Sequence, residues 1–322
     1  MRGGGFDDLD RALLHALQVD GRAPFRLLGS VLGVSDQTVA RRYARLRGAG
    51  SLRVVGLSDP AVVGDAQWVV RVRATPEAAG QVADALARRA DTSWISVCSG
   101  GTEIVAAAYG VTAGPLLLDT LPRTPQVVDV EAHQVLKVFY GGAGKPFTKH
   151  GPLDEAQLAR LTAELPVVGT ASPSVDEVDR RLLDVLRVDG RTSVEELAVA
   201  ASVSAATARR RLHDLRAGGV LRLDVDADLA LFGLPVRTVL WLTVAAAQLD
   251  VAGQALAAHR EVAYAAATTG EANVFATVST RDTAALYRYL TSEIGELPGV
   301  GPVRSAPVLR HVKAATVHYG PG

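Results

Sequence analysis

Residues 10–53 read DRALLHALQVDGRAPFRLLGSVLGVSDQTVARRYARLRGAGSLR, and residues 179–222 read DRRLLDVLRVDGRTSVEELAVAASVSAATARRRLHDLRAGGVLR. The two stretches align at a constant offset of 169 without a gap, and 20 of the 44 pairs are identical. Chance would leave only a few identities, so the stretch is a duplication. A repeat of this kind indicates two copies of one unit, each followed by its own downstream domain.

The first copy has the local pattern of three short helices and a strand. Leucines at helical spacing predict an amphipathic helix over roughly residues 7–18. Asp20-Gly21-Arg22 then forms a turn, and Pro24 opens a second short helix. Ser35 is a good N-cap for a third helix, which Gly48 and Gly50 end, and a short strand at 52–55 follows as a small wing. Because the second copy repeats each of these signals, the sequence predicts two winged helix-turn-helix domains.

The third helix can be phased from its apolar residues. Val39, Tyr43 and Leu46 must face the bundle, which leaves a polar, arginine-rich face outside. In a helix-turn-helix this helix enters the major groove, where arginine binds guanine or phosphate. The side chains that we expect at DNA are Ser35, Gln37, Thr38, Arg41, Arg42 and Arg45 in the first copy and Ser204, Thr207, Arg209, Arg210 and Arg211 in the second.

Charge is segregated along the chain although it sums to zero, with 34 Lys and Arg against 34 Asp and Glu. The segments Ser35–Arg53 and Ser204–Arg222 each hold five arginines and one aspartate, which gives +4 apiece and −8 for the remainder. A single basic helix face could be merely solvated. The recurrence of this face behind the same capped turn favours double-stranded DNA as a partner. With Ala205 and Ala206 in its first turn, the second helix is expected to contact phosphates more than bases.

A second kind of domain follows each helix-turn-helix copy. Alternating and periodic segments give the order βαββαβ twice, which predicts a ferredoxin-like sandwich. The fold class is therefore α+β, with two winged helix-turn-helix domains that each precede a sandwich. The expected domains are residues 1–60 (first helix-turn-helix), 66–140 (first sandwich), 141–174 (linker with a short helix), 175–228 (second helix-turn-helix) and 235–319 (second sandwich).

This organisation resembles the Lrp/AsnC (feast/famine) family of bacterial and archaeal transcription regulators. The resemblance rests on Asp10, Leu13, Leu14, Leu17, Asp20-Gly21-Arg22, Ser35, Thr38-Val39, Arg42, Leu46 and Gly50 and on their counterparts in the second copy. Members of this family usually carry one such unit and pair through the sandwich domain. The resemblance therefore implies a tandem fusion, which acts either as a pseudo-dimer within one chain or as a homo-oligomer.

The resemblance also implies a small-molecule effector, often an amino acid, bound between paired sandwiches. The family's loop after the second sandwich strand commonly reads Gly-x-x-Asp. Here the corresponding candidate residues are Gly100, Thr102 and Glu103 in the first copy and Gly270, Glu271 and Asn273 in the second. Both loops keep the glycine and depart at the acidic position, and a plain hairpin turn is the alternative interpretation of each.

Other site classes find little support in the sequence. One cysteine, Cys98, and seven scattered histidines make a metal site improbable, and no cofactor is expected. The stretch Gly141–Lys145 fails as a phosphate loop because Pro146 occupies the Ser/Thr position. We expect a cytoplasmic, non-enzymatic protein without a signal peptide or membrane span.

Two alternative functions remain open on the same architecture. Sirohaem decarboxylases resemble it, and some are fused tandem copies, but their His- and Arg-rich stretch would fall at Val54–Gln67 and Asp224–Arg237, where no histidine stands. A ligand-sensing scaffold that has lost DNA binding is the other. The intact basic recognition helices favour a sequence-specific transcription regulator over both.

Overall fold

The computed structural model describes residues 6–58, 66–110, 113–141, 149, 151–163, 165–166, 174–227 and 229–314. Contacts divide the chain into two compact units, and each unit combines both copies of the repeat. The helical unit consists of Met1–Asp59 and Ala143–Phe232, and the sheet unit consists of Pro60–Gly142 and Gly233–Gly322. Like domains of the two copies thus pair within one chain, as a pseudo-dimer.

The helical unit holds the two predicted three-helix domains. The first copy forms α1 (Asp8–Val19), α2 (Phe25–Leu32) and α3 (Asp36–Gly48), and the second forms α8 (Glu177–Val188), α9 (Val194–Ala201) and α10 (Ala205–Ala217). The serine caps are confirmed, because Ser35 accepts a hydrogen bond from the Thr38 amide and Ser204 accepts one from the Thr207 amide, each at 3.1 Å. The recognition helices are therefore α3 and α10.

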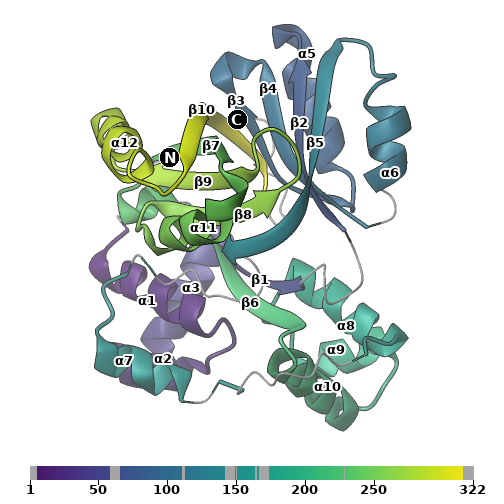
Figure 1. Cartoon of the computed structure of the whole chain (residues 1–322). Helices are drawn as coiled ribbons and strands as arrows, with labels where there is room; N and C mark the ends of the chain where they lie inside the picture. The colour runs from purple at the N-terminus through teal and green to yellow at the C-terminus, as the bar shows by residue number, and fades with distance from the viewer. Residues whose placement is uncertain are drawn as a thin grey trace. The chain divides into compact units, whose positions relative to one another are not determined.

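The wing expected in each copy takes a different form. Strand β1 (Leu52–Ser58) pairs antiparallel with β6 (Leu221–Ala227) over its full length, so each copy's strand completes the other's (Figure 1). Strand β1 packs against α8, and β6 packs against α1. A lone strand leaves its backbone amides and carbonyls unpaired, and here the equivalent strand of the other copy satisfies them.

The short helix expected in the linker at residues 141–174 is present as α7 (Glu155–Thr162). It packs against α1 and α2 of the first copy, where the Gln157 side-chain Nε2 donates to the Val31 carbonyl at 2.9 Å. A short helix, η3 (Leu229–Phe232), ends the helical unit. The glycine-rich stretch from residue 142 to 148 lies outside the described residues.

The sheet unit contains the order βαββαβ twice, as predicted. Its first copy consists of β2 (Gln67–Ala74), α5 (Pro76–Ala87), β3 (Thr92–Cys98), η1 (Ser99–Gly101), β4 (Glu103–Tyr109), α6 (Ala113–Pro115), η2 (Leu116–Thr120) and β5 (Val127–Tyr140). Its second copy consists of β7 (Val236–Val244), η4 (Ala246–Gln248), α11 (Leu249–Ala258), β8 (Val262–Thr268), β9 (Val274–Thr280), α12 (Thr283–Tyr289), η5 (Leu290–Ile294) and β10 (Val300–Lys313).

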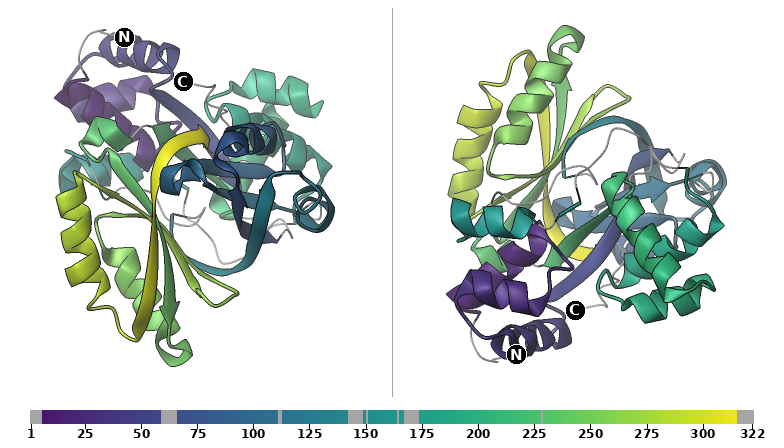
Figure 2. Two further views of the ribbon diagram at one scale, coloured as in Figure 1. Left: turned by 90° about the horizontal axis from the view of Figure 1, so that it is seen from above. Right: turned by 90° about the horizontal axis from the view of Figure 1, so that it is seen from below.

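The two sandwiches share their final strands and close into one barrel, in the order β10-β3-β4-β2-β5-β8-β9-β7. Strand β5 pairs with β2 of its own copy and then, from Val135 onward, with β8 of the other copy. The long, curved β10, yellow in Figure 2, does the same with β7 and then β3. The core between the sandwiches therefore draws Val69, Cys98 and Val105 from one copy and Trp241 and Phe275 from the other.

Candidate nucleic-acid interface and effector loops

Only some of the residues predicted to contact DNA are exposed on the outer face of each recognition helix. Gln37 and Arg41 on α3 and Arg209 and Arg210 on α10 are exposed. The serine and threonine at the start of each helix serve its cap, since the Ser35 and Thr38 hydroxyls lie 2.9 Å apart, as do those of Ser204 and Thr207. The exposed arginines and Gln37 are thus the side chains best placed to reach a DNA groove.

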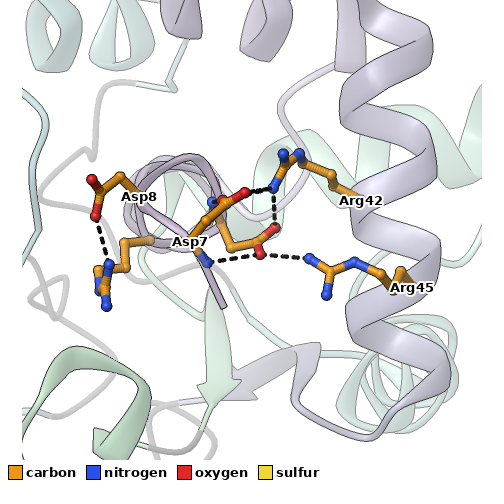
Figure 3. Close-up of polar contacts among 6 residues, drawn as sticks. Asp7, Asp8, Arg42 and Arg45 are labelled. Carbon is orange, nitrogen blue, oxygen red and sulfur yellow. Dashed lines mark hydrogen bonds and ion pairs between the residues drawn. The ribbon is translucent and has the colours of Figure 1, made fainter. Parts of the chain in front are cut away.

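Arg42 points away from the expected DNA face and binds the start of α1 (Figure 3). Its Nη1 lies 2.7 Å from both carboxylate oxygens of Asp7 and 2.9 Å from Asp10 Oδ1. Arg45 also donates to Asp10, whose side chain is fully buried. Helix phasing placed Arg42 on the outer face of α3, and the structure shows its long side chain reaching back to two carboxylates that already cap α1.

The second copy repeats this arrangement with one arginine fewer. Arg211 Nη2 lies 2.7 Å from Asp176, and its Nη1 lies 3.1 Å from Asp179 Oδ2. The position of Arg45 is taken by Asp214, so Asp179 has no second arginine partner among the described residues. Its Oδ1 atom is buried without a hydrogen-bond partner there, and burial raises the pKa of Asp179. Arg211 is therefore held as Arg42 is, by the capping carboxylates of its own copy.

The first copy's carboxylate cluster predicts an acid-sensitive helix start. Hydrogen bonds from Arg42 and from the Asp10 amide lower the pKa of Asp7. A lowered pKa in the folded state gives stability that is present above pH of about 4 and is lost as pH falls through the folded value. We expect an NMR titration to place the Asp7 carboxyl below its usual range and Arg42→Ala to raise that pKa. An unchanged Asp7 pKa in the variant would contradict the ion pair.

The first candidate effector loop, at residues 99–103, is open at its glycine. Ser99, Gly100 and Gly101 all adopt positive φ angles (52°, 74° and 88°), and a Cβ atom on Gly100 would meet no atom within 4 Å. Glu103 does not face this opening. Its carboxylate accepts two hydrogen bonds from Arg71, at 2.8 and 3.1 Å, and Arg71 also donates to Glu131 at 2.8 Å.

The second loop is closed by a side chain from the other copy. His133 Nδ1 lies 2.8 Å from the Thr269 carbonyl oxygen, and a Cβ atom on Gly270 would come within 2.3 Å of the same nitrogen. Asn273 donates to the Val244 carbonyl and accepts from the Val244 amide, both at 2.8 Å, and the Glu271 carbonyl accepts from Thr243. These contacts fill and anchor the loop.

Strand register explains the difference between the loops. His133 pairs with Val69 on β2, and the equivalent pair on β7 and β10 is Val239 with Ala306. A methyl group therefore stands in the second copy where the first has an imidazole. The duplication has kept two loops, of which one is open and one is filled.

Comparison with known proteins identifies both kinds of domain. The AsnC-type helix-turn-helix domain matches residues 6–47 and 175–216, and the Lrp/AsnC ligand binding domain matches residues 238–317. This chain belongs to the Lrp/AsnC family. The helix-turn-helix model matches twice, as the repeat predicts.

Curated relatives of this Lrp/AsnC chain correspond to about half of its length. The HTH-type transcriptional regulator FL11 of Pyrococcus abyssi (strain GE5 / Orsay) is 26% identical over 144 residues, which are 44% of this chain and 95% of the relative. The protein of the same name from Pyrococcus horikoshii is 24% identical over 143 residues, which are 44% of this chain and 94% of that protein. Each relative thus spans one repeat.

A solved structure shares the whole tandem fold. The siroheme decarboxylase NirDL aligns with a TM-score of 0.63 over 98% of this chain and 95% of its own, at 13% sequence identity. It has also been solved in co-complex with an iron-uroporphyrin III analogue. At this identity the likeness concerns the fold alone.

The buried titratable side chains of this Lrp/AsnC chain are arranged for packing. Cys98 is fully buried, and burial followed by the charge of Glu103 raises its pKa to about 12. Burial and the charge of Arg237 lower the pKa of His311 to about 3. Because Arg237 donates to His311 Nε2, the neutral ring carries its proton on Nδ1 and donates to Ser96 Oγ at 3.1 Å. In a catalytic serine–histidine pair the serine hydroxyl donates to the ring, so the hydrogen bond here runs in the opposite direction.

Two further findings concern the described residues only. They include no group of three or more His, Cys, Asp or Glu side chains that could hold a metal ion. They also include no helix with the length and apolar character needed to cross a membrane.

Proposed function

We propose that this chain is a sequence-specific DNA-binding transcription regulator whose two recognition helices bind two half-sites of one operator. The observation that carries the proposal is the repeated presentation of exposed arginine at one phase of two capped helices, Arg41 on α3 and Arg210 on α10. Arginine at this place in a helix-turn-helix can bind phosphate or guanine in the major groove. The names of the curated relatives support the same function.

A binding titration tests this function against its alternative. Fluorescence anisotropy at near-physiological salt would compare the DNA upstream of the chain's own gene with scrambled DNA of equal length. We expect the upstream DNA to bind tighter by about 10³ or more, the margin typical of specific regulators. Equal, weak binding to both would contradict sequence-specific regulation from that site.

A parallel spectroscopic titration with an iron-uroporphyrin compound tests the alternative of a decarboxylase-like enzyme. Only the shared tandem architecture favours that activity. A saturable change in the porphyrin absorption band together with absent DNA binding would replace the regulator by the enzyme.

We propose further that the effector binds at the loop of Gly100, Gly101 and Thr102 and that each chain binds one molecule. The open space at Gly100 and the few bonds that hold this loop support it, whereas His133 fills the equivalent space at Gly270. The effector class, an amino acid or a related small molecule, follows from the family resemblance. Glu103 would take part only by sharing its carboxylate with Arg71.

A variant at the open glycine is expected to weaken effector binding. Gly100→Asn keeps the positive φ angle, which asparagine tolerates, and places a side chain in the open space. A thermal-shift screen of the amino acids would first find the effector, and calorimetry would then give a stoichiometry of one per chain for the natural protein. We expect the variant to lose at least about tenfold in affinity, which corresponds to about 1.4 kcal/mol.

Gly233→Asn is the matched control, because Gly233 also has a positive φ angle of 77° and open space at its Cβ position. It should bind the effector as the natural chain does. A stoichiometry of two, or full affinity in Gly100→Asn, would contradict the assignment of the site.

A further inference from the structure

The Asp-Gly-Arg turns that mark each repeat face one another inside the helical unit and exchange hydrogen bonds. Arg22 Nη1 donates to the carbonyl oxygens of Gly190 and Thr192, each at 2.8 Å. Arg191 Nη1 returns the contact to the carbonyls of Gly21 and Ala23, at 2.7 and 3.2 Å. Each arginine side chain therefore donates to the turn of the other copy, while its backbone amide donates to the aspartate of its own turn.

The aspartates of the same turns hold the ends of the recognition helices. Asp189 forms an ion pair with Arg47 at 2.6 Å, and Asp20 forms one with Arg216 at 2.9 Å. Arg47 lies in the last turn of α3, and Arg216 lies in the last turn of α10. Each recognition helix is thus tied at its C-terminal end to the opposite copy.

The glycines let the paired strands pass close to both turns. A Cβ atom on Gly21 would lie 2.7 Å from Val54 Cγ1, and one on Gly190 would lie 2.9 Å from the same atom. The Gly190 amide also donates to the Val54 carbonyl at 2.8 Å. Only glycine fits at these two positions without displacing β1.

The two guanidinium groups are half-buried near one another, which is costly unless their charges are compensated. Burial first, and then the neighbouring charge of Arg191, lowers the pKa of Arg22. Carbonyl oxygens and the two aspartates provide the compensation. Arg191 also lies over the rings of Phe25 and Tyr43, 4.6 and 5.3 Å from their centroids. This many specific contacts favour one fixed arrangement of the two copies.

We infer that the two Asp-Gly-Arg turns form an intrachain clamp, which fixes the two recognition helices relative to each other and makes the chain selective for one spacing of its DNA half-sites. The clamp itself rests on the contacts described above. Its consequence, selectivity for one half-site spacing, rests on the proposed DNA-binding function. Arg22, Arg191, Asp20 and Asp189 are positioning residues. They act on DNA through α3 and α10 and need not touch it.

The clamp is tested first without DNA. Ala44 on α3 and His213 on α10 stand at equivalent exposed positions, so spin labels on cysteines introduced at both report the distance between the recognition helices. The natural Cys98 is fully buried with a raised pKa and should stay unlabelled. We expect a narrow distance distribution in the labelled parent and one at least about twice as broad after Arg22→Met with Arg191→Met. An unchanged width would overturn the clamp.

A milder variant covers the case in which the double methionine chain does not fold. Arg47→Ala with Arg216→Ala removes only the peripheral ion pairs, and Arg123→Ala in the sheet unit, 79% exposed, is the matched control. The peripheral variant should broaden the distribution in the same direction, and the control should leave it unchanged. Equal widths in all three chains would also overturn the clamp.

The consequence for DNA is tested in two steps. Half-sites are first selected with the natural chain. A series of duplexes then carries two such half-sites whose spacing increases by one base pair at a time across one helical turn. The natural chain should show one sharp optimum, with affinity at least about tenfold lower half a turn away. The clamp variants should reduce that ratio to below about threefold and leave affinity for a single half-site unchanged. Unaltered spacing selectivity overturns the inference, whereas absent specific binding by the natural chain overturns the proposed function even if the distance measurement supports the clamp.

Discussion

Arg211→Ala is expected to lower the free energy of unfolding of the helical unit by about 3 kcal/mol, since it leaves a buried carboxylate without its cationic partner. Asp179 is only 4% exposed, Arg211 is the arginine that binds it, and its second oxygen already lacks a partner among the described residues. For a unit of this size the loss should lower the melting temperature by roughly 6–12 °C in calorimetry.

The first copy should tolerate the equivalent change better. In Arg42→Ala, Asp10 keeps its hydrogen bond from Arg45, so we expect a smaller loss of about 1–2 kcal/mol. The two copies thus provide an internal comparison, in which the same substitution differs in effect because Asp214 has replaced the second arginine. Equal losses in both copies would show that the second arginine contributes nothing.

Controls for this prediction lie on the same helix. Arg210 is 65% exposed and, among the residues that the structure describes, pairs only with Asp214, at 3.9 Å, so Arg210→Ala should change stability by less than about 0.5 kcal/mol. Asp179→Ala combined with Arg211→Ala should recover part of the loss, since it removes the stranded charge. A loss in Arg211→Ala no larger than in Arg210→Ala would contradict the structural role of Arg211.

Local signals in the sequence predicted the elements well. Ser35, Ser204 and the glycines behind each helix act within a few residues, so the helix boundaries could be derived from them. The order βαββαβ followed from alternation and turn residues for the same reason. The resemblance to the Lrp/AsnC family rested on these elements and on the repeated motif, and domain matches confirm it.

Contacts between copies could not be derived in this way. Nothing in residues 52–58 says that their partner is residues 221–227, and nothing in Val135–Tyr140 says that it pairs with β8. Helix phasing gave the angle of Arg42 around α3 but not its partner. One signal could have found that partner, because Asp7 and Asp10 recur as Asp176 and Asp179 at the start of each copy. The filling of the Gly270 loop by His133 left no sequence signal.

Arg42 and Arg211 bind capping carboxylates, so the prediction for DNA binding centres on Arg41 and Arg210. Arg41→Ala combined with Arg210→Ala should reduce affinity for the operator at least about tenfold and leave the melting temperature unchanged. Both side chains are exposed, and within the described part of the chain only Arg210 has an ion pair, which is long and weak. If each arginine neutralises one phosphate, the slope of log affinity against log salt should become shallower by about 1.8, since each contact contributes about 0.9.

The measurement is an anisotropy titration at four or more salt concentrations, with Arg123→Ala as the matched control. Arg123 is an exposed arginine of the sheet unit in an i,i+4 ion pair with Asp119, so its removal changes the net charge without touching a recognition helix. Because net charge alone steers association, the control separates that general effect from direct contact. A slope and affinity that match the control would remove both arginines from the DNA interface. If either arginine contacts a base, its removal should instead weaken binding to the specific site by about 1–3 kcal/mol and affect binding to scrambled DNA less.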